Sequence, residues 1–449
     1  MLPRSLRFDH LLTPNGWLSP GRIEVDCTGS IETVSQSSDN ADESVRGFAV
    51  PGMPNVHSHA FQRVFAGCTE HLSAEPGADS FWTWREAMYG FAERLTPEDV
   101  EAISALAFVE MVEAGFTSVG EFHYLHHRPD GSRYADPAEL ARAVLKATET
   151  AGIAITLLPV LYTRGGFDAP IGTRQRRFAH ADLDELLALA DGLSDEATVG
   201  LALHSLRAVT AAEVGAATGR APIHIHVAEQ RREVEECVAT RGARPIRWLL
   251  DNAAVDQNWC LVHATHADAD ERRALATSSA VAGLCPTTEA NLGDGVFPLT
   301  SFLDEGGDIA LGTDSHASIS VAEELRTLEY GQRLVHEQRN VTASAAAPHT
   351  ARRLFEAALA GGARALAQPT GRLEPGKRAD VVVLDADHSR LLGHGCETAL
   401  DAWAFSSNGT SPVRDVFVRG ERLVAEGRHA RRSEVLSAFR SALTRIRSG

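Results

Sequence analysis

The chain has 449 residues, of which 44% are apolar and 23% charged, the profile of a globular α/β enzyme rather than of a disordered or fibrous protein. This length exceeds one ordinary hydrophobic core but suits an α/β barrel with a smaller appended domain. The formal net charge of −17 argues against nucleic acid as a partner, because binding to a polyanion normally needs a basic stripe.

Short β-rich apolar runs alternate with amphipathic helical stretches along the middle of the chain. One helix is expected over residues 96–114, where Thr96 suits the N-cap and Pro97 the first helical position. Alternating strands and helices predict a parallel sheet, and eight repeats allow that sheet to close into a (β/α)8 barrel. The expected barrel strands cover residues 47–56, 117–122, 153–161, 199–203, 222–227, 259–264, 280–284 and 308–312.

The two ends of the chain have a different character from its middle. Residues 1–46 and about 370–430 contain short strand-like pieces separated by turn residues. We expect them to form one small β-sandwich with the barrel inserted between its halves, followed by a closing helix over about residues 432–447. The predicted domains are the N-terminal part of the sandwich, the barrel, and the C-terminal part with the helix, over residues 1–48, 49–369 and 370–449.

Polar residues follow four of the expected strands at the point where each strand ends. Residues two apart in an extended chain project to the same side, so the imidazoles of His57 and His59 can reach one ion. A lone His-x-His pair is as readily an incidental pair as a metal site, but the C-terminal ends of barrel strands carry the active site in this fold. The recurrence of histidines and carboxylates at this rim of the barrel therefore predicts a metal-dependent active site. The residues are His57 and His59 on the first strand, His226 and Glu229 on the fifth, His263 on the sixth and Asp314 on the eighth.

These residues and their positions resemble the amidohydrolase superfamily, and the resemblance covers the whole chain, including the β structure from both ends. The resemblance implies that His57, His59, His226 and Asp314 are metal ligands and that Glu229, His263 and Asp314 are catalytic. Three imidazoles and one carboxylate suit Zn²⁺, with Fe²⁺ as the alternative.

The fourth strand is informative because many dinuclear members of the superfamily carry a carboxylated lysine at its end. Here the corresponding residues 201–207 contain no lysine, so we expect a single divalent metal. Together with the His226-x-x-Glu229 spacing, this absence indicates the deaminase-like branch, in which the glutamate carries a proton to the departing nitrogen.

Three distant segments, residues 57–63, 79–89 and 204–209, narrow the resemblance to members that hydrolyse N-formimino-L-glutamate to N-formyl-L-glutamate and ammonia in histidine breakdown. Water activated by the metal would attack the formimino carbon. The two carboxylates of this substrate call for two fixed cations, and the side chains of Arg85 and Arg207 are expected near the active-site rim. Trp82 and Trp84 are expected to pack in a lid. The predicted substrate contacts are Gln62, Arg85, Tyr124, His204 and Arg207.

Some alternatives stay open. His204 is as readily a histidine satisfied by neighbouring backbone as a substrate contact. A related aminohydrolase acting on a ring, such as guanine or another purine or pyrimidine, would use the same metal ligands but needs stacking aromatic residues more than arginines. A non-catalytic scaffold with the same barrel is a third hypothesis, although the complete set of ligands argues against it.

The expected partner is a small dicarboxylate, and we expect a homodimer. The six cysteines lack CxxC spacing, and no stretch approaches the roughly 18 apolar residues of a membrane span. No apolar signal segment follows Met1. These features predict a cytoplasmic protein with reduced thiols and no membrane partner.

Overall fold

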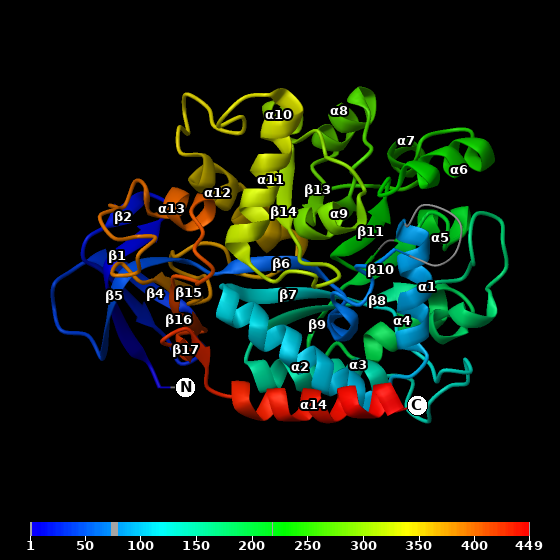
Figure 1. Ribbon diagram of the computed structural model, residues 1–449, viewed down its shortest axis with the longest axis horizontal. Helices are drawn as coiled ribbons and strands as arrows, with labels where there is room; N and C mark the ends of the chain where they lie inside the picture. Colours follow the sequence, from blue (N-terminus) through cyan, green and yellow to red (C-terminus); the bar gives the residue numbers. More distant parts are fainter. Residues whose placement is uncertain (1, 73–79, 218, 449) are drawn as a thin grey trace.

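A computed structural model describes residues 2–72, 80–217 and 219–448 of the chain. In this part, eight parallel strands form a closed barrel, because β14 pairs with β6 and β10 pairs with β8. The short strand β9 (Thr198–Val199), which precedes β10, also pairs with β8. The expected (β/α)8 barrel with a separate sheet from the chain ends is thereby confirmed (Figure 1). The barrel strands are β6 (Met53–Ser58), β7 (Phe116–His123), β8 (Ala154–Leu161), β10 (Leu201–Ser205), β11 (Ile223–Val227), β12 (Trp259–His263), β13 (Val281–Leu284) and β14 (Asp308–Leu311).

The separate sheet joins residues from both ends of the chain. Its central pairings are β1 with β5, which run parallel, and β5 with β15, which run antiparallel. In Figure 1 it lies to the left of the barrel, where blue N-terminal strands adjoin orange C-terminal ones. The strands of this sheet are β1 (Arg4–Thr13), β2 (Gly16–Leu18), β3 (Gly21–Val25), β4 (Ile31–Gln36), β5 (Glu43–Pro51), β15 (Val381–Leu384), β16 (Val413–Val418), β17 (Glu421–Ala425) and β18 (Arg428–His429).

The apolar run over residues 47–56 differs from the single barrel strand expected there, because it is divided between the two sheets. Its first part belongs to β5, and the barrel strand β6 begins only at Met53. Between them, the N–H of Gly52 donates to the carbonyl oxygen of Asp380 over 3.0 Å. A Cβ atom at Gly52 would lie 2.2 Å from Cγ2 of Thr117, so only glycine lets the chain cross from one sheet to the other here.

Helices surround the barrel. The expected helix over residues 96–114 is α2, which begins at Pro97 after a capping box between Thr96 and Asp99. The expected closing helix is α14, which lies along α2 at the lower edge of Figure 1. The α-helices are α1 (Phe81–Ala92), α2 (Pro97–Ala114), α3 (Glu139–Ala151), α4 (Leu183–Gly192), α5 (Ala211–Ala216), α6 (Arg231–Arg241), α7 (Pro245–Asn252), α8 (Ala269–Ser278), α9 (Pro286–Leu292), α10 (Leu299–Asp304), α11 (Val321–His336), α12 (Thr350–Ala365), α13 (Ala399–Phe405) and α14 (Arg432–Ser448), and the 3-10 helices are η1 (Ala60–Phe65) and η2 (Thr173–Phe178).

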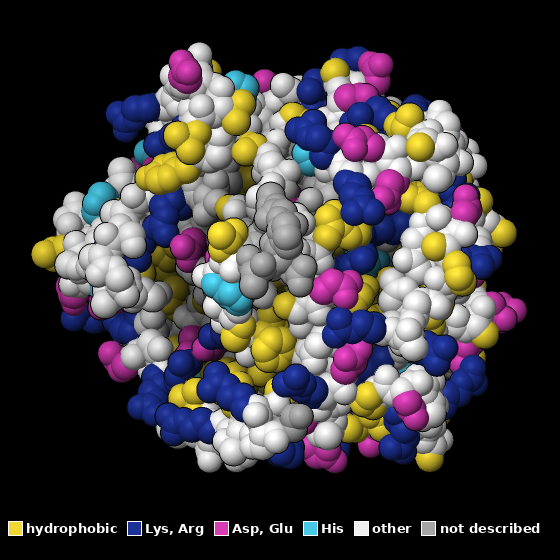
Figure 2. Space-filling model, turned by 45° about the vertical axis from the view of Figure 1, so that its right-hand side comes forward, with side chains coloured by type: hydrophobic (Ala, Val, Ile, Leu, Met, Phe, Trp, Pro, Cys, Tyr) yellow, Lys and Arg dark blue, Asp and Glu magenta, His cyan; other side chains and the backbone are white. Residues whose placement is uncertain are grey.

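The buried barrel strands hold in place the C-terminal rim of the barrel, where these strands end. Every residue of β6, β7, β11 and β12 is buried, as expected for parallel strands that are covered on both faces. Of the described helices, none is both long and apolar enough to cross a membrane. Figure 2 shows acidic and basic side chains interspersed over one face of the molecule.

Candidate metal centre and substrate cavity

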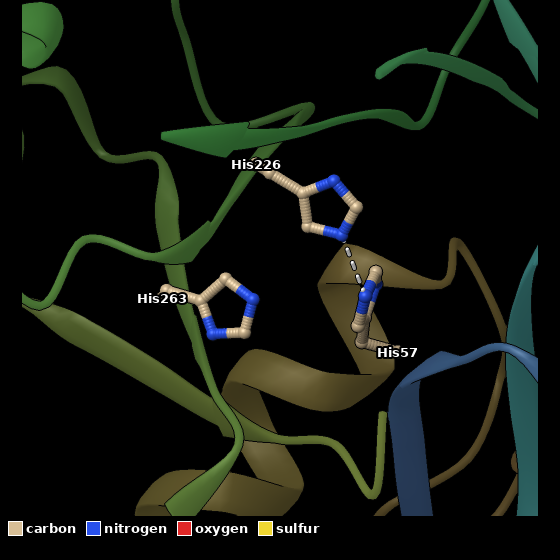
Figure 3. Close-up of side chains that lie close together, drawn as sticks. All are labelled: His57, His226 and His263. Carbon is tan, nitrogen blue, oxygen red and sulfur yellow. Dashed lines mark hydrogen bonds between the residues drawn. The ribbon is translucent and has the colours of Figure 1, made fainter. Parts of the chain in front are cut away.

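Three histidines from different strands face a common space at the C-terminal rim of the barrel. His57 lies near the end of β6, and His226 and His263 lie on the neighbouring strands β11 and β12 (Figure 3). The Nε2 atom of His57 is 2.9 Å from Nε2 of His226 and 3.1 Å from Nε2 of His59. The histidines predicted from strands one, five and six therefore converge.

The contacts of Nδ1 in His59 and His226 show which ring nitrogen carries the hydrogen. Nδ1 of His59 lies 3.0 Å from the carbonyl oxygen of Phe122, and Nδ1 of His226 lies 2.8 Å from that of His204. A carbonyl oxygen only accepts, so each Nδ1 carries the hydrogen and each Nε2 presents a lone pair. Burial, and then the neighbouring histidines, lowers the pKa of His57 and His226, which keeps these rings neutral.

Asp314 adds a carboxylate to the three imidazoles. Its Oδ1 atom lies 3.4 Å from Nε2 of His57 and 3.3 Å from Nε2 of His59. The backbone fixes this approach, because the N–H of Asp314 donates to the carbonyl of His57, and the N–H of His59 donates to the carbonyl of Asp314. Lone pairs that face one another without a hydrogen between them need a cation, and this donor set fits a borderline divalent metal ion.

His263 stands beside this cluster and is surrounded by carboxylates. Its Nε2 atom lies 3.8 Å from Oε1 of Glu229 and 3.8 Å from Oδ2 of Asp314, and its Nδ1 atom lies 3.2 Å from Oε1 of Glu289. Burial opposes the charged ring, but the carboxylates outweigh it and raise the pKa of His263. Burial also raises the pKa of Glu229, which favours proton exchange near neutral pH.

Two supporting glutamates were missed by sequence reasoning. Glu289, in the first turn of α9, accepts from the N–H of Cys285 over 2.9 Å besides facing His263. Glu233 accepts from the N–H groups of Ala228 and Glu229 over 3.2 and 3.0 Å, which holds the turn after β11. The signal for Glu289 was its position soon after the seventh strand, five residues beyond Leu284, whereas Glu229 lies two residues beyond the fifth strand.

Ser58, the last residue of β6, lies between His57 and His59 and is also held by buried side chains. Its hydroxyl donates to Glu121, which accepts from the N–H of Ala60 over 2.8 Å as well. Burial raises the pKa of Glu121 to about 8. Nε2 of His316 lies 3.1 Å from the same hydroxyl. These contacts fix the backbone that presents His57 and His59.

A cavity opens beside the cluster, and all five predicted substrate contacts line it together with Glu229, His263 and Asp314. Trp84, which was expected only to pack in a lid, also lines it. The remaining lining residues that sequence reasoning missed are Phe81, Met88, Tyr89, Tyr162, Phe178 and Leu292. Of the 79–89 segment, Asp79 lies outside the described residues.

The predicted polar contacts leave unused hydrogen-bonding groups in the cavity wall. Nε2 of Gln62 donates to the hydroxyl of Tyr124 over 2.8 Å, while its buried Oε1 has no partner among the described residues. Burial raises the pKa of Tyr124, so its phenol stays protonated. Nδ1 of His204 lies 3.1 Å from the hydroxyl of Ser205.

The two predicted arginines lack strong carboxylate partners. Nε of Arg207 donates to the Ser205 hydroxyl over 3.4 Å, and its buried Nη1 has no partner among the described residues. Nη2 of Arg85 is 3.9 Å from Oε1 of Glu86, and its buried Nε is likewise unpartnered there. Guanidinium groups that lack a close carboxylate and keep unpartnered N–H groups can bind an anionic ligand.

Comparisons with known proteins agree with this geometry. Residues 48–423 match the model of the Amidohydrolase family. The formimidoylglutamate deiminase of Pseudomonas aeruginosa is 48% identical over 442 residues, which are 96% of this chain and 97% of that protein. The 5-methylthioadenosine/S-adenosylhomocysteine deaminase of Natronomonas pharaonis is 30% identical, over 96% of this chain and 94% of its own length. A crystal structure of an amidohydrolase from Brucella melitensis superposes with a TM-score of 0.92 and 44% identity, covering 98% of this chain and 99% of that one.

Proposed function

Because this chain belongs to the amidohydrolase family, we propose that it is a formimidoylglutamate deiminase, which hydrolyses N-formimino-L-glutamate to N-formyl-L-glutamate and ammonia. The observation that carries this proposal is one cavity that combines the histidine and aspartate cluster with two arginines lacking strong carboxylate partners. The P. aeruginosa relative named formimidoylglutamate deiminase matches almost the whole chain and supports the same substrate. This reaction belongs to histidine degradation.

His57, His59, His226 and Asp314 would hold one divalent ion, with Zn²⁺ favoured and Fe²⁺ as the alternative. When bound, the ion supplies Lewis acidity, which makes a water molecule reactive near neutral pH. A single ion is proposed because β10 ends without a lysine.

The chain's own residues carry the proton transfers. Asp314 takes a proton from the attacking water, and the charged ring of His263 orients that water and stabilises negative charge. Oε1 of Glu229 gives a proton to the terminal nitrogen of the formimino group as the water adds to the carbon. The hydroxyl proton of the adduct then moves to the same nitrogen, which leaves as ammonia while the carbon becomes a formyl group. The proton held by Asp314 returns to Glu229, so both protons of the water end on ammonia. Arg85 and Arg207 bind the two carboxylates, and Gln62, Tyr124 and His204 complete the substrate contacts.

The aromatic rings of the cavity, such as Tyr162 and Phe178, favour a second candidate, a purine or pyrimidine deaminase. An assay of ammonia release that compares N-formimino-L-glutamate with guanine and cytosine separates the two. We expect turnover of the first compound alone. Faster release from guanine or cytosine would reject the proposal, and no release by metal-loaded protein would favour the non-catalytic scaffold.

We also propose that the enzyme is a cytoplasmic homodimer. Support for pairing comes from the outer face of α11, where the side chains of Leu334 and Val335 are 83% and 60% exposed. Light scattering on the purified protein tests this assembly, and a monomer at micromolar concentration would contradict it.

A further inference from the structure

The indole ring of Trp82, in the first turn of α1, contacts three arginine side chains from separate parts of the barrel rim. The distance from the guanidinium carbon to the ring centroid is 4.5 Å for Arg85, 5.2 Å for Arg207 and 4.4 Å for Arg232. Arg85 lies on the same helix, Arg207 follows β10, and Arg232 is in the first turn of α6. All three distances are within the roughly 6 Å of a cation–π interaction.

Two of the three cations, Arg85 and Arg207, make no close ion pair with a carboxylate among the described residues. Arg207 is only 8% exposed and makes no ion pair among the described residues, and Arg85 has only the 3.9 Å approach to Glu86. Arg232 does pair, since its Nε lies 2.6 Å from Oε1 of Glu236, but its side chain is 60% exposed. Gathering like charges at a partly buried place is unfavourable unless an anion joins them.

An aromatic partner differs from a carboxylate in what it leaves free. A carboxylate would neutralise a guanidinium and occupy its N–H groups, whereas an indole face attracts the cation and leaves the N–H edge able to donate. The unpartnered Nε of Arg85 and Nη1 of Arg207 fit this description. Trp82 therefore holds two arginines at the cavity with charge and donors still available.

We propose that Trp82 is a positioning residue for substrate recognition, which orders Arg85 and Arg207 for the two carboxylates, and that Arg232 on the same ring is an outer cation attracting the dianion. This inference rests on the proposed function and adds to it how the site distinguishes dicarboxylates from monocarboxylates. Trp82 does not line the cavity, so it acts through the arginines.

Binding of the product tests this role without turnover. Calorimetry with N-formyl-L-glutamate and with the monocarboxylate N-formyl-4-aminobutyrate compares wild type with Trp82→Leu and Trp82→Phe. We expect Trp82→Leu to weaken dicarboxylate binding about tenfold and monocarboxylate binding less, and Trp82→Phe, which keeps an aromatic face, to stay within about threefold of wild type. Equal affinity of Trp82→Leu and wild type for N-formyl-L-glutamate would overturn the proposal, and so would equal losses for both ligands.

Arg232 has a matched control in its neighbour Arg231, which is also exposed but makes no cation–π interaction with Trp82 among the described residues. Arg232→Gln should weaken N-formyl-L-glutamate binding about threefold at low salt, with the difference vanishing near 0.5 M salt. Arg231→Gln removes the same charge and should bind as wild type does. Identical effects of the two variants would overturn the role of Arg232.

The proposed function and the positioning role of Trp82 can be rejected independently of one another. If wild type binds N-formyl-L-glutamate in a Trp82-dependent manner but releases no ammonia from N-formimino-L-glutamate, the proposed function is rejected and the positioning role stands. If wild type turns over N-formimino-L-glutamate and KM is the same in Trp82→Leu, the positioning role is rejected alone. Thermal unfolding of each variant, measured alongside, excludes misfolding as the cause of a loss.

Discussion

Oε1 of Glu289 lies 3.2 Å from Nδ1 of His263, while Nε2 of the same ring lies 3.8 Å from both Glu229 and Asp314. Glu289 thus orients the imidazole from behind and favours its charged form, as carboxylates commonly do for catalytic histidines. The interaction links the seventh strand, which supplies none of the proposed ligands, to the reacting groups.

Replacing Glu289 by glutamine should lower kcat about tenfold and leave KM within about twofold, because the amide keeps an acceptor but loses the charge that sustains imidazolium. Steady-state ammonia release measures both constants. Glu324→Gln is the matched control, since Glu324 is a buried glutamate that accepts from the N–H of Thr287 over 2.9 Å. An unchanged kcat in Glu289→Gln would show that the carboxylate only holds the backbone of Cys285.

Removing the metal should abolish activity and lower the thermal midpoint. An ion that binds only the folded chain stabilises it by about 2.7 kcal/mol at one hundred times its Kd. Elemental analysis, activity and thermal unfolding before and after chelation measure the effect, and Zn²⁺ should restore all three. His226→Ala should lose the ion, whereas His266→Asn, at the same rim but outside the cluster, should keep it. A fully metal-loaded His226→Ala would remove His226 from the ligand set.

Glu229→Gln should retain the metal and lose most turnover, by a factor of about 10² to 10⁴, because an amide cannot pass a proton to the leaving nitrogen. Metal content and single-turnover ammonia release of the same preparation separate the two effects. If ammonia is released at the wild-type rate, another group carries the proton.

The alternation of strands and helices was enough to predict the barrel, and the polar residues at four strand ends were enough to predict which side chains meet. The division of residues 47–56 was not predictable from the local pattern, since the apolar run continues through Gly52 and its first part pairs with β15 far along the chain. The domain boundaries at 48/49 and 369/370 stay a prediction.

Contacts that depend on how helices sit above the rim were also beyond the sequence. Whether Glu289 faces His263 depends on the direction in which α9 leaves its strand. Trp82 was expected to pack in a lid because it is aromatic and lies in the long segment after the first strand. Its contacts with Arg207 and Arg232 appear only when three separate segments are brought together.

Replacing Arg207 by alanine should raise KM for N-formimino-L-glutamate about tenfold to a hundredfold with a smaller change in kcat. The reason is that a guanidinium hydrogen-bonded to a substrate carboxylate far from the reacting carbon contributes mainly to substrate binding. Arg207→Lys should recover part of the loss, since a lysine keeps the charge but not the forked donors that match a carboxylate. Arg220→Ala is a control, because Arg220 pairs with Asp191 away from the cavity. Steady-state kinetics on the three variants check the prediction, and a wild-type KM in Arg207→Ala would show that this arginine, although it lines the cavity, does not bind the substrate.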